Sequence, residues 1–101
     1  MKIYQSKSFE KKVKKFSEKE KQALDDAIKQ IIQNPSVGSE KKGDLRGVFV
    51  HKFNLQTQPY LLAYRFVNEE GLELIMIGPQ HENYYRDLKT YLKNRFNEVL
   101  F

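Results

Sequence analysis

Residues 77–89 concentrate the side chains that could transfer a proton or bind a charged ligand. They read Ile-Gly-Pro-Gln-His-Glu-Asn-Tyr-Tyr-Arg-Asp-Leu-Lys, so six groups able to hydrogen-bond or exchange protons follow one another at 81–86. An imidazole titrates near ~6.5, which makes His81 the best candidate for moving a proton, and Glu82 could orient it. Side chains held where two rigid elements meet are typical of binding and catalytic sites. The alternative is a capped helix in which Tyr85 is an ordinary core residue.

Two elements must position this segment. The apolar run Leu-Glu-Leu-Ile-Met-Ile at 72–77 predicts a buried strand. Gly78-Pro79 is expected to end that strand, because proline has no N–H for the sheet. Beyond it, apolar residues spaced by three and four predict a helix, and they are Tyr85, Leu88, Leu92, Phe96 and Val99. The segment is therefore expected to be a strand-to-helix corner.

The N-terminal third predicts a short strand followed by two helices. Residues 2–4 are the strand candidate, and Ser6 or Ser8 can cap a first helix that carries Phe9, Val13 and Phe16 on one stripe. Ser17-Glu-Lys-Glu20 has the form of a capping box and starts the second helix, which Asn34-Pro35 ends. The short connection between these helices predicts an antiparallel hairpin.

The middle of the chain predicts a loop at 35–46 and strands at 47–55 and 60–67, which turns link to 72–77. The order β-α-α-β-β-β-α predicts an α+β fold over residues 1–101, as one domain: a two-helix N-terminal hairpin packed on a small antiparallel sheet, with a C-terminal helix. Both faces of the three-stranded meander are partly apolar, so the helices should cover one face and part of the other.

The face left partly uncovered is expected to be concave and to bring Lys52, Arg65 and the 81–86 corner together. Two alternatives remain open: Arg65 pairs with Glu73 across the hairpin, and Lys52 is an ordinary exposed strand lysine. His51 shares its strand face with phenylalanines, so we interpret it as a core residue rather than a catalyst.

Composition limits the class of protein. The 101 residues carry 18 Lys and Arg against 13 Asp and Glu, and the net charge of +5 favours a polyanionic partner. Nine lysines fall within residues 2–29, largely on a helix face that we interpret as a solubility feature. The absence of cysteine excludes disulfides and thiolate metal sites, and two distant histidines argue against zinc, so no metal or cofactor is expected. Neither a membrane span nor a signal peptide is found, which predicts a cytoplasmic protein.

Several of these residues together resemble a known family. The loop Gly43-Asp-Leu-Arg-Gly47 precedes the strand with Lys52, Leu61-Leu-Ala-Tyr-Arg65 follows, and a helix with paired tyrosines comes after Gly78. Over essentially the whole chain this order resembles the RelE/ParE superfamily of toxins from bacterial type II toxin–antitoxin systems. The resemblance implies a partner antitoxin and one of two activities. RelE-like members cut mRNA in the ribosomal A site, whereas ParE-like members inhibit DNA gyrase without being enzymes.

The resemblance also implies site residues, incompletely. Lys52 matches a basic strand position of the RelE-like nucleases, and Tyr85 matches the tyrosine of their last helix. Their other basic positions are occupied by Asn54, Leu61 and Pro79-Gln80 here. A nuclease must therefore rely on other groups, of which His81 is the foremost.

The functional hypothesis is a toxin that acts as a ribosome-dependent, metal-independent mRNA endonuclease. We expect the catalytic residues to be His81, Tyr85, Lys52 and Arg65, and the nucleic-acid-binding residues to be Arg46, Asn83, Arg86 and Lys89. The expected partners are a cognate antitoxin, the ribosome and mRNA. The alternatives are a ParE-like inhibitor of DNA gyrase and, more remotely, a small basic RNA-binding module. The oligomeric state stays open.

Overall fold

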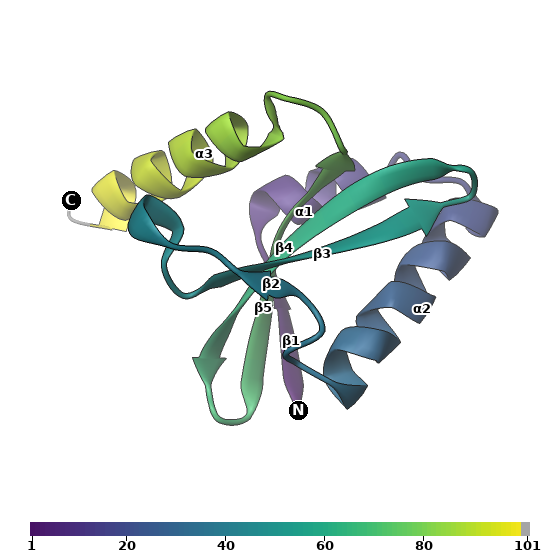
Figure 1. The fold of residues 1–101 in the computed structure, drawn as a ribbon, viewed down its shortest axis with the longest axis horizontal. Helices are drawn as coiled ribbons and strands as arrows, with labels where there is room; N and C mark the ends of the chain where they lie inside the picture. Colours follow the sequence, from purple (N-terminus) through teal and green to yellow (C-terminus); the bar gives the residue numbers. More distant parts are fainter. Residues whose placement is uncertain (100–101) are drawn as a thin grey trace.

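Five strands form one mixed sheet that carries helices on both faces (Figure 1). The structure is a computed structural model that describes residues 1–99 and the side chains of residues 1–95. Its elements are β1 (Lys2–Gln5), α1 (Lys7–Val13), α2 (Glu18–Gln33), β2 (Ser39–Glu40), the 3-10 helix η1 (Gly43–Leu45), β3 (Val48–Leu55), β4 (Gln58–Asn68), β5 (Gly71–Pro79) and α3 (Tyr84–Val99). The predicted α+β fold and order of helices are confirmed. The apolar positions expected at 96 and 99 lie outside the described side chains.

The sheet differs from the expected antiparallel meander in three ways. Its order is β1-β5-β4-β3-β2, and β1 pairs parallel to β5, with Lys2 opposite Gly71. Two residues of the expected loop form β2, which pairs with β3. Finally, β5 runs through Gly78 to Pro79, which lies opposite Tyr60, so the expected break comes after Pro79 rather than before it. Proline is tolerated there because it lies at the end of a strand.

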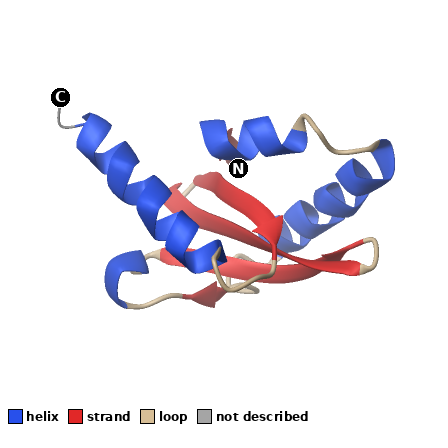
Figure 2. Ribbon diagram, turned by 90° about the horizontal axis from the view of Figure 1, so that it is seen from above, coloured by secondary structure: helices blue, strands red, loops and turns tan. Residues whose placement is uncertain are grey.

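Two separate cores lie on the two faces of the sheet. On one face, α1 and α2 pack against β4 and β5; the buried residues are Phe9, Leu24, Ile31, Leu62, Tyr64, Leu72, Leu74 and Ile77. On the other, α3 packs against the sheet and η1; the buried residues are Leu45, Val48, Val50, Leu61, Ala63, Ile75, Tyr84 and Leu88. The helices lie apart around the central sheet in the second view (Figure 2). The expectation that both faces of the meander are partly apolar, with helices packed on each, is confirmed.

Local signals explain where the N-terminal helices begin. The Ser6 hydroxyl accepts a hydrogen bond from the Phe9 N–H at 3.0 Å and so caps α1. At the start of α2 the predicted capping box is present, because the Ser17 and Glu20 side chains each accept from the other's backbone N–H. Among the described residues, no helix is long and apolar enough to cross a membrane.

The edge of the sheet beside β1 creates the space for a site. β1 pairs with residues 71–74 only, and the chain then leaves the sheet at Ser6 to enter α1. The Ser6 N–H donates to the Leu74 carbonyl at 3.0 Å, and its hydroxyl donates to the Ile75 carbonyl. The remainder of β5, residues 75–79, therefore forms the sheet edge between α1 and the start of α3.

Candidate functional site

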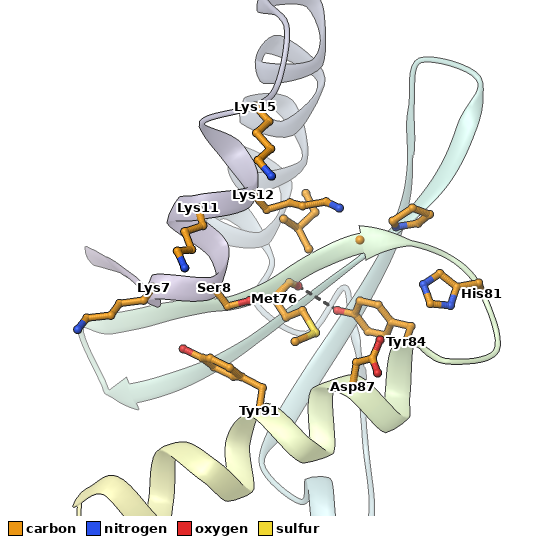
Figure 3. A pocket seen from close by; sticks show the side chains of 13 residues that line it. Lys7, Ser8, Lys11, Lys12, Lys15, Met76, His81, Tyr84, Asp87 and Tyr91 are labelled. Carbon is orange, nitrogen blue, oxygen red and sulfur yellow. Dashed lines mark hydrogen bonds between the residues drawn. The ribbon is translucent and has the colours of Figure 1, made fainter.

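A cavity of about 530 Å³ opens at this edge, between α1 and α3 (Figure 3). Four lysine side chains line its α1 side, and we name it the lysine cleft; they are Lys7, Lys11, Lys12 and Lys15. The floor comes from β5, and His81 lies at the corner where β5 leads into α3. Asp87 and Tyr91 of α3 line the facing wall. The cleft thus combines an imidazole with four ammonium groups and one carboxylate.

Helical periodicity explains why the lysines gather in the cleft. Phe9 is buried and Val13 packs beside it on the α1–α2 core, which fixes the rotation of α1. Positions 7, 11 and 15 recur every four residues and so lie along one face of the helix and its continuation. Four of the nine lysines that we interpreted as a solubility feature line this cavity instead.

His81 is exposed and combines two of the roles considered for it. Its Nδ1 accepts a hydrogen bond from the Asn83 N–H at 3.0 Å, and its carbonyl accepts from the Tyr84 N–H at 3.1 Å. The residue therefore does help to organise the turn that starts α3. Its ring nevertheless remains at the rim of the lysine cleft. An imidazole that accepts at Nδ1 carries its proton at Nε2, so Nε2–H can donate to a ligand, whereas Nδ1 must give up its bond with Asn83 to act as a base.

The two tyrosines of the corner divide the expected roles. Tyr84 is only 2% exposed, and its hydroxyl donates to the Met76 carbonyl at 2.9 Å. Burial strongly raises the pKa of this phenol, so it stays protonated and anchors α3 to β5. Tyr85 is half-buried against the α3 core, and the Lys41 ammonium lies 5.1 Å from its ring centroid. Tyr85 is thus turned toward η1 and lies outside the lysine cleft.

Arg65 is engaged in a structural ion pair. Its Nε donates to Glu73 at 2.7 Å, and the guanidinium of Arg95 donates to the same carboxylate at 2.9 and 3.0 Å. Burial raises the pKa of Glu73, but the hydrogen bonds and charges of the two arginines outweigh it and lower that pKa overall. The structure therefore contains the Arg65–Glu73 pair that the sequence left open as an alternative to a catalytic role.

The prediction that the four expected catalytic residues converge on one concave region is therefore wrong. His81 lies in the lysine cleft, and Arg65 lines a neighbouring cavity of about 760 Å³ with Glu73. Lys52 is exposed on β3 and lies opposite Leu61 of β4. Leu61 is four residues before Arg65 on that strand, which separates Lys52 from Arg65 by about 13 Å along the sheet. Tyr85 contributes to neither cavity. The catalytic roles of these residues stay predictions, but one shared hollow does not hold them.

The expected nucleic-acid-binding residues surround α3 and η1 without lining the cleft. Arg86 and Lys89 are exposed on α3, and Arg46 is exposed after η1 beside Lys41 and Lys42. Asn83 is half-buried, and its carbonyl accepts from an α3 backbone N–H. The four cleft lysines and Tyr91 were not predicted from the sequence to be site residues. The only available signal was the four-residue lysine spacing, which does not reveal that α3 lies opposite.

His51 is a core residue, as interpreted from its strand face. Its side chain is 9% exposed and stacks on Phe53, with ring centroids 6.1 Å apart. Burial lowers the pKa of the imidazole, and its Nε2 has no hydrogen-bond partner among the described residues.

Comparisons with known proteins identify a matching family and structures of similar fold. A family model described as the ParE-like toxin of type II bacterial toxin–antitoxin systems matches residues 3–89. The fold is similar to that of a doubly substituted E. coli RelE toxin in the free state, at 14% identity and TM-score 0.69, covering 93% of this chain and 95% of that chain. A chain of the intact E. coli RelBE toxin–antitoxin complex is 16% identical with TM-score 0.63, covering 80% of this chain and 98% of that chain. The isolated E. coli RelE toxin is 17% identical with TM-score 0.61, covering 89% and 97%. No curated protein sequence matches the chain.

Proposed function

Because the matched family model shows that the chain belongs to the ParE-like toxins of type II toxin–antitoxin systems, within the RelE/ParE superfamily, we propose that it is a ribosome-dependent mRNA endonuclease. In this proposal the toxin blocks translation in the cytoplasm and a cognate antitoxin neutralises it. The fold shared with E. coli RelE, which forms the RelBE toxin–antitoxin complex, supports the antitoxin partner.

The observation that carries the nuclease proposal is the position of His81 in a cavity walled by lysines. Metal-independent RNA cleavage needs a base for the ribose 2′-OH, cations for the charge that develops on phosphorus, and an acid for the 5′-oxygen. The exposed His81 imidazole exchanges its bond with the Asn83 N–H for one with the 2′-OH and accepts the proton. Lys11 and Lys12 stabilise the phosphorane, as ammonium groups do for phosphate oxygens.

The reaction balances without any other reagent. The 2′-oxygen bonds to phosphorus, its proton passes to the imidazole, and the bond from phosphorus to the 5′-oxygen breaks. The departing 5′-oxygen takes a proton from an ammonium group of the cleft or from water. The products are a 2′,3′-cyclic phosphate and a 5′-hydroxyl. Lys52 and Tyr85, on the α3 side of the sheet, are assigned contacts with messenger or ribosomal RNA away from the reacting phosphate, as are Arg46 and Arg86.

The test is induced expression followed by primer extension on a translated mRNA. The wild-type chain is expected to produce discrete cleavage sites, whereas His81→Ala should lose them, because removal of an acid–base group costs ~10²–10⁴-fold in rate. Gln80→Ala is the matched control, since this neighbouring residue is exposed and its backbone N–H still donates to the Pro59 carbonyl. Full cleavage by His81→Ala would remove the imidazole from the mechanism.

Inhibition of DNA gyrase is the second candidate, and one observation favours it. Three of the basic positions that the resemblance to RelE-like nucleases implies are occupied here by Asn54, by the buried Leu61 and by Pro79-Gln80, which leaves Lys52 as the matching one. Arg65, which we expected to be catalytic on other grounds, is bound to Glu73. A ParE-like inhibitor would act through its surface without a reaction. Supercoiling measured in the same cells separates the two: loss of negative supercoiling with intact mRNA favours gyrase inhibition, and the reverse favours the nuclease.

A further inference from the structure

We propose that the lysine cleft and the neighbouring cavity around Arg65 form one continuous track that binds a short segment of single-stranded RNA. The proposal rests on the proposed function and extends it from the reacting phosphate to the strand that carries it. The two cavities, of about 530 and 760 Å³, share two lining residues, Lys7 and Tyr91. A strand that enters beside His81 therefore passes Tyr91 before it reaches Arg65.

One face of α3 forms a wall of the track along its length. Tyr84, Asp87, Tyr91 and Arg95 recur at spacings of three and four, which places them along one side of the helix. The eleven helical steps from Tyr84 to Arg95 span about 16 Å at the rise of an α-helix. The wall is fixed at both ends, because Tyr84 bonds to Met76 of β5 and Arg95 bonds to Glu73 of the same strand.

The charge of the track suits a polyanion. Six cationic side chains line the two cavities against two carboxylates; the cations are Lys7, Lys11, Lys12, Lys15, Arg65 and Arg95, and the acids are Glu73 and Asp87. Glu73 already accepts hydrogen bonds from two guanidinium groups, which leaves that cluster with a net positive charge. Cations on both sides of a groove attract the phosphate backbone of a nucleic acid.

Tyr91 at the junction favours a single strand over a duplex. The side chain is half-buried, and the Arg95 guanidinium carbon lies 5.6 Å from its ring centroid. An aromatic ring set between cations is the arrangement on which proteins stack unpaired bases. A duplex presents its bases already stacked on one another, so it cannot use this ring. We assign Tyr91 the role of stacking platform and the α1 lysines the role of phosphate contacts.

The experiment measures binding of a fluorescently labelled single-stranded RNA octamer to the full chain by anisotropy, at several salt concentrations. Tyr91→Ala should weaken binding roughly tenfold or more, whereas Tyr91→Phe should bind as the wild type does, because the ring is kept. Lys11→Ala should weaken binding and reduce the slope of log K against log[salt] by ~0.7. A hairpin duplex of the same sequence should compete poorly.

Lys14→Ala is the matched control for the lysines, since Lys14 is exposed at the end of α1 but does not line either cavity. Equal weakening by Lys14→Ala and Lys11→Ala, unchanged binding by Tyr91→Ala, or equal competition by the duplex would each overturn the track. Circular dichroism of each variant separates loss of binding from loss of fold. Wild-type mRNA cleavage without octamer binding would overturn the track alone, whereas octamer binding without mRNA cleavage would overturn the proposed nuclease and leave the track standing.

Discussion

Replacing Glu73 by alanine removes the carboxylate that holds Arg65 and Arg95 together, and we expect a loss of about 2 kcal/mol in the free energy of unfolding. The Glu73 side chain is 13% exposed, Arg95 is 26% exposed and Arg65 is 42% exposed. Removing one partner from a fully buried pair costs ~3–5 kcal/mol, whereas an exposed pair contributes only ~0–1 kcal/mol. This cluster lies between those limits, because both arginines can turn partly to water once the carboxylate is gone.

Urea unfolding followed by circular dichroism measures the effect. With a slope of ~1–2 kcal/mol per molar urea for a domain of this size, the midpoint should fall by about 1–2 M. Glu70→Ala is the matched control, because this exposed residue lies in the turn between β4 and β5 and its side chain forms no ion pair within the described part of the chain. Arg95→Ala should cost more than Arg65→Ala, since Arg95 donates two hydrogen bonds to Glu73 and Arg65 one.

The pH dependence gives an independent check of the same cluster. The two arginines hold the pKa of Glu73 below its ordinary value of 4.5 despite burial. Between the folded-state pKa and pH 4.5, the unfolded chain therefore binds more protons than the folded chain. The contribution of Glu73 is therefore fully present above pH 4.5 and is lost as the pH falls through the folded-state pKa. The difference in stability between the wild type and Glu73→Gln should shrink on acidification. If the urea midpoint of Glu73→Ala were no lower than that of Glu70→Ala at any pH, the ion-pair cluster would not stabilise the fold. Arg65 would then be available to bind phosphate.

Three further predictions concern stability and use the same urea measurement. Tyr64→Phe should cost about 2 kcal/mol, because the hydroxyl accepts from the buried Gly38 N–H at 3.0 Å and the variant leaves that donor unpaired; an unchanged midpoint would contradict this. His51→Leu should raise stability by about 1 kcal/mol at neutral pH by removing an unpartnered buried nitrogen. Because burial lowers the pKa of His51 from 6.5, protonation below pH 6.5 favours the unfolded chain, so the wild type alone should lose further stability as the pH falls; parallel pH profiles of the wild type and His51→Leu would exclude the effect. Ser17→Ala should cost about 1 kcal/mol through loss of the α2 capping box, whereas a loss confined to experimental error would show that this helix end does not depend on it.

The elements that depend on local signals were predictable from the sequence. The capping box at Ser17, the helix end before Pro35 and the hairpin that joins β4 to β5 each depend on residues only a few positions apart. The two apolar faces of β4 also follow from the alternation of its side chains. Such features are set by the backbone preferences of short segments, so their prediction does not depend on how distant elements pair.

The features that depend on distant pairing were not predictable in the same way. No local signal joins β1 to β5, whose paired residues are 69 positions apart, and the lysine cleft exists only because β1 ends halfway along β5. The lysines of α1 gave a pattern of charge but no indication that His81 lies across from them. The register shift in β5 breaks the alternation of faces near Ile75, and periodicity assigned the core position on α3 to Tyr85 although Tyr84 is the buried residue.

The nuclease proposal requires that the imidazole at the rim of the lysine cleft performs chemistry on RNA. Primer extension on one translated mRNA, from cells expressing either the wild type or His81→Ala at equal protein levels, tests it most directly. We expect discrete cleavage sites with the wild type, none with His81→Ala, and unchanged supercoiling of plasmid DNA in both. Intact mRNA beside relaxed plasmid in wild-type cells would contradict it.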